Sequence, residues 1–419
     1  MIAVREAVVA VIFLATIAAL YFRPPGAKDW QVALAGAILA WLASPLTPAA
    51  ALRELRGTWN IEAFFLGLML LAAGAETAGL YARAAQWLGR FTGPGARVAA
   101  VLGSGTAITA ILSNDATPLI LTPAVFAAAA TESASTTAAA FAVTFAADGA
   151  SLLLPISNPV GLLFYDRFGL TFGDWMRDIF PAAVAAIVVL AAVLWWRSRS
   201  VGSGQDARLT SFATPSVGLE RWAAGIFGAL AVVYIAAAAA GIALGLVTLA
   251  GGIALMAAVV LSGSGVTVYC RKVSPGLLIF VAALLVLVRC ASAAGVFDSA
   301  GSAFDWLAGE PIAVALLGAA IAGMALSNLV NNWPAAVVLA TLISGQGAGR
   351  EPLLVGALIG CTVGANLTVV GSLSTVFWLS LTRQAGARYT TVDYGRRAWR
   401  PTLAAVAAAW LVAWACLVL

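Results

Sequence analysis

Long apolar runs recur along almost the whole chain, and they limit what the chain can fold into. Several are long enough to cross the roughly 30 Å hydrocarbon layer of a bilayer as a helix. Of the 419 residues, 62% are hydrophobic and 10% are charged, whereas about 25% of the residues in a soluble domain are charged. The alternating ten-residue strands typical of transmembrane barrels are absent. The sequence therefore predicts an all-α polytopic membrane protein.

Composition also excludes several classes of chemistry. Histidine is absent, which excludes haem ligation, imidazole–zinc sites and histidine proton relays. The four cysteines form no C-x-x-C pair and are expected to be packing residues. No G-x-x-x-x-G-K-[ST] loop occurs, so the chain cannot be its own ATPase. We expect a transporter rather than an enzyme, with no cofactor, no metal and no nucleic-acid partner, and we attribute the net charge of +5 to basic loops.

Polar residues, prolines and glycines divide the apolar sequence into predicted spans. Two further stretches, at 98–130 and 311–345, carry polar residues and prolines at their middles, which is typical of re-entrant helical hairpins. The first apolar run is followed directly by more spans, so it is expected to be a transmembrane helix rather than a signal peptide. The ten predicted spans are 6–22, 31–46, 60–80, 136–165, 179–196, 221–239, 241–262, 275–291, 352–382 and 402–418.

Motifs repeat in order across a polar segment that runs from Arg197 to Arg221. The stretch "AILSNDATP" in the first half corresponds to "MALSNLVNNWP" in the second. Upstream, "AETAGLYARAA" corresponds to "ASAAGVFDSAG", and downstream, "LPISNPVG" corresponds to "VGANLTVVG". These ordered matches predict one repeat over residues 1–196 and a second over 221–419, joined by a cytoplasmic linker at 197–220.

The number of spans predicts that the two repeats are inverted. Each half holds five spans and one hairpin, and an odd number of spans reverses the orientation of the second half. Most of the 23 Lys and Arg residues then fall on one side, with the linker and the "RQAGARYTTVDYGRRAWR" loop. By the positive-inside rule that side is cytoplasmic, which places both termini outside the inner membrane. Inverted repeats of this kind are typical of secondary transporters.

Four polar clusters interrupt the apolar sequence at equivalent places in the two halves. The hairpins contain "LSNDATP" and "LSNLVNNWP", and the spans that follow them contain "ISNPVG" and "GANLTVVGS". Pro159 breaks its helix, and irregular backbone at membrane depth survives only where protein or a wet cavity covers it. We therefore predict a substrate cavity where the clusters meet. Its candidate residues are Ser113, Asn114, Asp115, Thr117, Ser157, Asn158, Ser327, Asn328, Asn331, Asn332, Asn366, Thr368 and Ser372.

Three carboxylates lie within or at the ends of predicted spans. Because an ionised carboxylate in hydrocarbon is costly, such residues usually face a cavity and bind protons or ions. Asp115, at the tip of a hairpin, is the first candidate for proton coupling, Asp148 is the second, and Glu76 is the third. Asp148 has a structural capping role as its alternative. Arg289 lies within a span and has no partner nearby in the sequence.

Four stretches resemble the signatures of ArsB-type arsenite efflux permeases, members of the ion transporter superfamily. They are "LSNDATPLILTP", "AADGASLLLPISNP", "LSNLVNNWP" and "GCTVGANLTVVGSLSTVFWL", and the similarity extends over essentially the whole chain. The resemblance implies export of arsenite and antimonite, with elevator-type movement of the domain that carries the hairpins. It also implies an ATPase subunit as a candidate cytoplasmic partner, for which Arg197 to Arg221 is the docking segment.

The polar clusters suit arsenite, which is an uncharged trihydroxide at neutral pH. We expect oxygen and nitrogen contacts rather than thiolates, because only Cys361 lies near a motif. A dicarboxylate would require Arg or Lys near the site, and none is evident beside the motifs. Uphill export of a neutral solute needs a coupled ion, which favours proton antiport. The alternatives are a sodium/proton antiporter or another anion transporter on the same scaffold, an intramembrane protease and a channel; the last two lack sequence support.

Overall fold

The computed structural model describes residues 2–22, 27–91, 93–128, 134–199, 217–263, 273–346 and 349–419. Within these ranges all regular secondary structure is helical. By length and composition, seven helices of the described residues could each cross a membrane. The prediction of an all-α multi-span protein is confirmed. Most of the segment between Arg197 and Arg221 lies outside the described residues.

The first half of the chain forms three long helices, a helical hairpin, a broken helix and a further long helix. The predicted hairpin at 98–130 corresponds to α6 and α7, and the predicted span at 136–165 is broken between α8 and α9. Helices α3 and α5 are short amphipathic helices that the sequence did not predict. The elements are α1 (Ile2–Phe22), α2 (Asp29–Ala43), α3 (Pro48–Gly57), α4 (Trp59–Thr77), α5 (Leu80–Leu88), α6 (Pro94–Ile111), α7 (Ala116–Ala127), α8 (Ala134–Gly149), η1 (Pro155–Ser157), α9 (Pro159–Phe168), α10 (Phe172–Asp174), η2 (Trp175–Ile179) and α11 (Phe180–Arg199).

The second half has the same kinds of element in the same order. The hairpin predicted at 311–345 corresponds to α17 and α18, and the span predicted at 352–382 is broken between α19 and α20. The elements are α12 (Val217–Ala239), α13 (Leu244–Leu261), α15 (Pro275–Ala293), α16 (Asp298–Ala308), α17 (Ile312–Val330), α18 (Asn332–Ser344), α19 (Arg350–Thr362), η3 (Gly364–Leu367), α20 (Leu373–Gln384) and α21 (Thr391–Val418).

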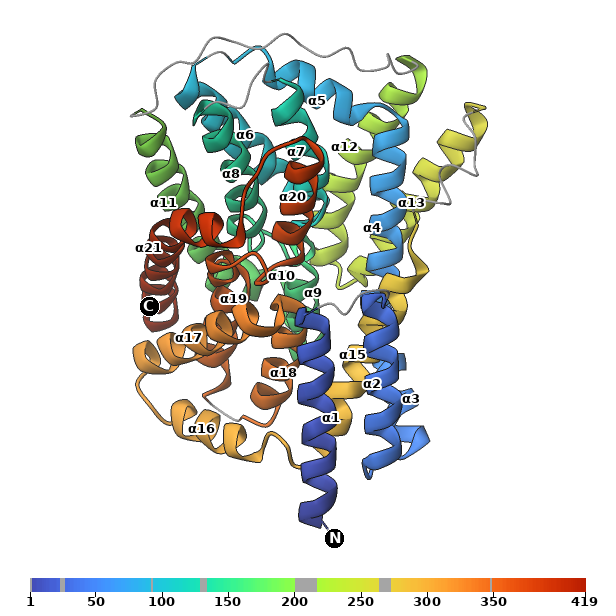
Figure 1. The fold of residues 1–419 in the computed structure, drawn as a ribbon, viewed down its shortest axis with the longest axis vertical. Helices are drawn as coiled ribbons and strands as arrows, with labels where there is room; N and C mark the ends of the chain where they lie inside the picture. The colour runs from blue at the N-terminus through green and yellow to red at the C-terminus, as the bar shows by residue number, and fades with distance from the viewer. Residues whose placement is uncertain are drawn as a thin grey trace.

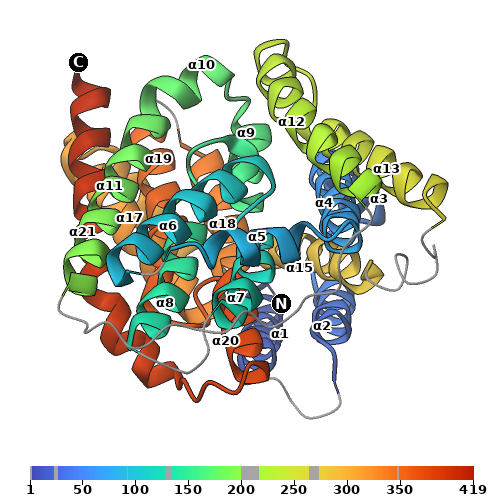
Figure 2. The same cartoon turned by 90° about the horizontal axis from the view of Figure 1, so that it is seen from above.

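The helices form two groups that lie side by side (Figures 1 and 2). The flanking group consists of α1 to α4, α12, α13 and α15, in which α4 packs on α13 and α2 packs on α15. The hairpin group consists of α6 to α9, α11 and α17 to α21, in which α6 packs on α8 and α17 packs on α19. In Figure 1, α6 and α7 lie in the upper half of the view, whereas α17 and α18 lie in the lower half.

Glycines allow the closest helix pairs to pack backbone to backbone. A Cβ atom on Gly360 of α19 would lie 2.2 Å from the carbonyl oxygen of Ala320 in α17, and one on Gly356 would lie 2.2 Å from that of Leu316. In the flanking group, a Cβ on Gly67 of α4 would lie 2.4 Å from backbone atoms of α13. Small residues at interfaces are the usual basis of helix packing in membranes, where the hydrophobic effect between helices is weak.

Candidate substrate cavity between the helix groups

Each hairpin turn is bonded to the broken helix of its own half. The amide of Asn114, in the turn between α6 and α7, donates to the carbonyl of Ser157 at 2.8 Å. The amide of Asn332, at the start of α18, donates to the carbonyl of Gly371 at 2.9 Å. The structure therefore brings each "Ser-Asn" hairpin motif against the break that follows it, as the sequence predicted.

Both hairpins turn on a non-glycine residue with positive φ, namely Ser113 at 156° and Asn331 at 81°. The left-handed backbone of Asn331 costs on the order of 1 to 3 kcal/mol unless its surroundings hold it. Its side chain provides that support, because Nδ2 donates to the carbonyl of Val370 at 2.9 Å and Oδ1 accepts from the amide of Trp333 at 3.3 Å. The Asn331 side chain thus fixes the turn to the second break and supports the strained backbone of the same residue.

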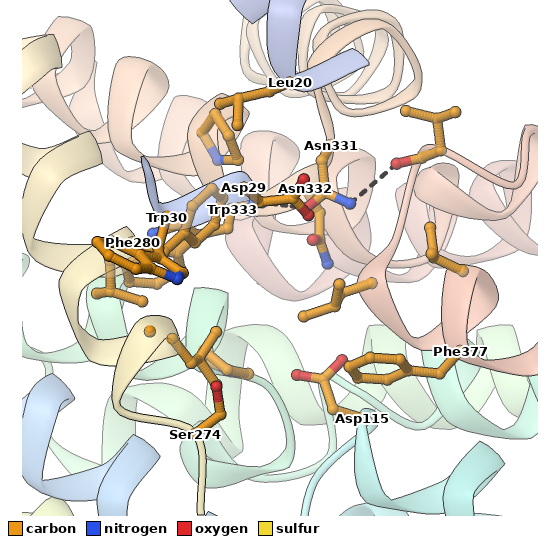
Figure 3. Close-up of a pocket in the computed structure, with 18 of the residues that line it drawn as sticks. Leu20, Asp29, Trp30, Asp115, Ser274, Phe280, Asn331, Asn332, Trp333 and Phe377 are labelled. Carbon is orange, nitrogen blue, oxygen red and sulfur yellow. Dashed lines mark hydrogen bonds between the residues drawn. The ribbon is translucent and has the colours of Figure 1, made fainter. Parts of the chain in front are cut away.

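A cavity of about 1280 Å³ lies between the flanking and hairpin groups. Figure 3 shows Asp115 on one side of this cavity and the hairpin residues Asn331, Asn332 and Trp333 across from it. Asn158 also lines the cavity. Four of the predicted substrate-site residues, Asp115, Asn158, Asn331 and Asn332, therefore share one chamber.

The N-terminal ends of six helices line this cavity. Residues at or beside the first turns of α2, α7, α9, α15, α18 and α20 are among its walls. Helix N-termini carry partial positive charge and unpaired amide donors. Asn158 caps α9, because its Oδ1 accepts from the amide of Val160 at 2.9 Å, and Pro159 occupies the first helical position. The arrangement favours a ligand whose surface is rich in oxygen atoms.

Two buried donors on the cavity wall have no hydrogen-bond partner among the described residues. They are Nδ2 of Asn158 and the indole Nε1 of Trp333. Both atoms are buried beneath the cavity surface, and leaving such a group unpaired costs roughly 1 to 3 kcal/mol, so each would be stabilised by a ligand oxygen that reached it. Trp333 belongs to the motif "LSNLVNNWP", but the sequence did not predict it as a site residue, because a tryptophan in an apolar helix is usually a packing residue.

The carboxylate of Asp115 faces the cavity and is partly exposed. Among the residues that the structure describes, no side chain donates a hydrogen bond to it or pairs with it. It follows Asn114 in the turn and directly precedes α7, so its position is set by the backbone of the hairpin. A carboxylate held in this way can accept bonds from a ligand or take up a proton.

Asp148, at the C-terminal end of α8, is fully buried and surrounded by donors. Its Oδ1 accepts from the Asn114 amide at 3.1 Å and from the hydroxyls of Ser372 and Ser374, each at 2.8 Å. Its Oδ2 accepts from the Thr375 hydroxyl at 3.2 Å. This carboxylate therefore joins the first half of the chain to the start of α20 in the second. Sequence reasoning missed Ser374 and Thr375, although they follow Ser372 directly in the motif.

The remaining predicted substrate residues stabilise the frame of the cavity rather than line it. Asn328 donates to the carbonyls of Met324 and Gly364 and accepts from the amide and hydroxyl of Thr368, all between 2.7 and 2.9 Å. Asn366 accepts from the phenol of Tyr394 at 3.0 Å. Ser113, Asn114, Thr117, Ser157, Ser327, Asn366, Thr368 and Ser372 are absent from the described lining of the cavity.

Two basic side chains line the cavity, which corrects the expectation that none lies near the site. Lys28, just before α2, and Arg383, in the last turn of α20, are both exposed and both contribute to its wall. Neither belongs to a polar motif, so sequence proximity could not place them. Glu76 is exposed at the end of α4 and is not part of the lining, and Arg289 lies 3.9 Å from Glu54.

Comparison with known proteins identifies the kind of protein to which this site belongs. Residues 1–360 match the CitMHS family, which is described as a citrate transporter. The chain belongs to the CitMHS family. It is thus a multi-pass membrane protein and a secondary transporter, not an enzyme.

Individual relatives of this CitMHS protein are distant. The arsenical pump membrane protein of Escherichia coli strain K12 is 27% identical over 402 residues, covering 92% of each chain. A protein of Mycobacterium tuberculosis, named uncharacterized transporter Rv2684, is 26% identical over 374 residues, covering 85% of this chain and 86% of its own. The YdaH transporter of Alcanivorax borkumensis has the same overall fold, with a TM-score of 0.56 at 14% identity over 97% of this chain and 98% of its own.

Proposed function

We propose that this CitMHS transporter exports arsenite and antimonite, and that it does so by exchange with protons. The observation that carries the proposal is the set of polar groups in the cavity without protein partners. The Asp115 carboxylate can accept hydrogen bonds, and Asn158 Nδ2 and Trp333 Nε1 can donate them. An uncharged trihydroxide both donates and accepts hydrogen bonds, so it can satisfy all three groups. The names of the distant relatives support the same substrate.

The position of the cysteines supports oxygen and nitrogen contacts to the substrate. Cys361 is fully buried in α19, where its Sγ lies 3.8 Å from the carbonyl of Gly323 in α17, and it does not line the cavity. Cys290 is also buried, in α15. Thiolates bind trivalent arsenic tightly, whereas a transporter must release it, and none of the cysteines that the structure describes lines the cavity.

Asp115 is the better candidate for the proton carrier. Four donors converge on Asp148 and make it a structural link between α8, the first hairpin and α20. Asp115 has no such donors within the described structure and faces the cavity, so a proton can reach it. Neutral arsenite gains nothing from the membrane potential, and proton exchange at Asp115 would supply the driving force.

The element order supports the inverted repeat over residues 1–196 and 221–419. Equivalent helices make equivalent contacts, because α2 packs on α15 as α13 packs on α4, and α6 packs on α8 as α17 packs on α19. The elevator movement, the inner-membrane location with external termini, and the ATPase subunit docked at residues 197–220 belong to the same proposal.

Transport of a citrate-like carboxylate is the second candidate. The family description suggests it, and Lys28, Arg383 and six helix N-termini place positive groups on the cavity wall, beside Asp29 and Asp115, that would bind carboxylate groups. The two candidates differ in charge, so they differ in their dependence on these basic residues and on the membrane potential.

Arsenite uptake into everted membrane vesicles with an acid interior tests the proposal. We expect uptake that follows the pH gradient in the wild-type chain and falls to background in Asp115→Asn. Asp305→Asn, a change at an exposed helix residue outside the cavity, should leave uptake unchanged. Gradient-driven movement of citrate without arsenite uptake would replace arsenite by the second candidate.

A further inference from the structure

A cluster of charged and amide side chains lies at the C-terminal end of α9, opposite the end that Asn158 caps. Nη1 of Arg167, in the last turn of α9, lies 2.7 Å from Oε1 of Glu54 in α3. Oε2 of the same carboxylate lies 3.9 Å from Nε of Arg289 in α15. Glu54 therefore bridges arginines from two helices that are far apart in the sequence. This contact also accounts for Arg289, which had no partner in its own segment.

A second bond beside it extends the connection to α13. Nδ2 of Asn60 in α4 donates to Oδ2 of Asp166 at 2.5 Å, and Oδ1 of Asn60 accepts from the amide of Gly245 at 2.7 Å. A Cβ on Gly245 would lie 1.9 Å from the carbonyl oxygen of Asn60, so only glycine allows α13 to approach this closely. One side chain thus fixes the ends of α9 and α13 to the start of α4.

This junction crosses from one helix group to the other. Helix α9 packs against α18 and α19 of the hairpin group, and Nε of Arg167 also donates to the Ser344 hydroxyl at the end of α18 at 3.3 Å. The other residues of the junction lie in α3, α4, α13 and α15, which all belong to the flanking group. At its other end α9 begins with the cap of Asn158, which lines the substrate cavity.

The junction is accessible to water. Its four charged residues line a separate cavity of about 260 Å³, and the Arg167 and Glu54 side chains remain 27% and 18% exposed, whereas Asn60 is buried. An ion pair with access to water can separate and be rehydrated at small cost, unlike a fully buried pair. The contacts are therefore suited to forming and breaking repeatedly.

We propose that Glu54, Asn60, Asp166, Arg167 and Arg289 form a latch between the two helix groups. The latch holds α9, and with it the Asn158 wall of the cavity, against the flanking group in the state described here. It opens when the hairpin group moves, so each transport cycle breaks and remakes it. This inference rests on the proposed function, because it requires a transport cycle with relative movement of the two groups.

A matched pair of cross-links tests the latch. In a chain whose four cysteines are replaced by alanine, Glu54→Cys and Arg167→Cys are joined with a short bifunctional thiol reagent that can be cleaved by reductant. A disulfide would be too short, because the two side chains meet only at their tips. The control joins Arg177→Cys to Glu351→Cys, an arginine–glutamate pair at 3.5 Å between α19 and η2, which continues into α11 and packs on α21 of the hairpin group.

The latch predicts that the cross-link between positions 54 and 167 stops arsenite uptake into everted vesicles and that reductant restores it. The control cross-link should leave uptake within about twofold of the uncross-linked chain. Undiminished uptake with positions 54 and 167 joined would overturn the latch. If the uncross-linked parent takes up no arsenite, the proposed function fails, and the same comparison is made with citrate.

Neutralising the latch without a cross-link provides a second test that does not depend on thiol chemistry. Glu54→Gln should increase amide hydrogen exchange in α9 and at the start of α4, and shift uptake rates by about two- to fivefold, the range expected for a partly exposed ion pair. Glu351→Gln should change neither quantity. Faster exchange in Glu54→Gln with an unchanged uptake rate would reduce the junction to a structural contact and contradict the latch.

Discussion

The two broken helices carry similar sequence motifs but perform different tasks in the structure. Both carry a buried Asn whose Nδ2 has no partner among the described residues, but in the first break Asn158 caps α9 and lines the cavity. In the second, Asn366 is fully buried and accepts a hydrogen bond from Tyr394 of α21. The first break thus lies at the cavity wall, whereas the second is bonded within the hairpin group.

The hydroxyl groups after the second break explain the difference. Ser372, Ser374 and Thr375 all bond to Asp148, a residue of the first half of the chain. The first break is followed instead by Pro159, Val160 and Gly161, which offer no side-chain donor. Two halves with similar motifs therefore need not use them alike, because a few polar residues decide which break is bonded to the other half of the chain.

Removal of the Asp148 carboxylate should have the largest effect on stability. Asp148→Ala leaves four buried donors without their acceptor, and each unsatisfied group costs about 1 to 3 kcal/mol. We expect a destabilisation of about 3 kcal/mol or more and poor recovery of folded protein. Thermal unfolding in detergent measures this, with Asp305→Ala as the control. An unfolding temperature equal to that of the wild type would show that the second break does not depend on Asp148.

Removal of the Asn158 amide should instead affect substrate affinity. Asn158→Ala removes a donor to the substrate together with the cap of α9, so we expect the KM for arsenite to rise about tenfold. The loss of the cap should lower the stability by only about 1 kcal/mol. Asn158→Asp separates the two effects, because it retains the cap acceptor and removes only the donor. An unchanged KM in both variants would contradict the substrate role of the first break.

Tyr394→Phe should have a smaller effect, and on stability alone. It removes one buried hydrogen bond to Asn366 while retaining the aromatic packing against Phe141, which is stacked at 5.7 Å. A typical buried bond contributes about 1 kcal/mol. We expect a lower unfolding temperature and an unchanged KM for arsenite. A rise in KM as large as that of Asn158→Ala would place the second break in the substrate site as well.

The sequence predicted the multi-span helical fold because apolar length and helix breakers are local properties. Three of the predicted hairpin residues, Asp115, Asn331 and Asn332, line the cavity, but the motifs could not separate them from the five predicted hairpin residues that do not. It could not distinguish Asn158 from Asn366, because their roles depend on Tyr394, which lies in a different helix. The sequence did not predict Lys28 and Arg383 as cavity residues, because only the tertiary packing of α2 and α20 brings them to one cavity.

Removal of a basic residue of the cavity should have the smallest effect on arsenite uptake, and it discriminates between a neutral and an anionic substrate. Arg383→Gln removes a charge at an exposed position on the cavity wall, and a neutral trihydroxide gains little from that charge. We therefore expect arsenite uptake to change by less than about twofold, as for most solvent-screened charges. Inhibition of that uptake by citrate should weaken severalfold, whereas Arg388→Gln, an exposed arginine outside the described lining, should leave it unchanged. If arsenite uptake falls as steeply as citrate inhibition, the transported species is an anion, and α20 takes part in substrate binding through its C-terminal turn.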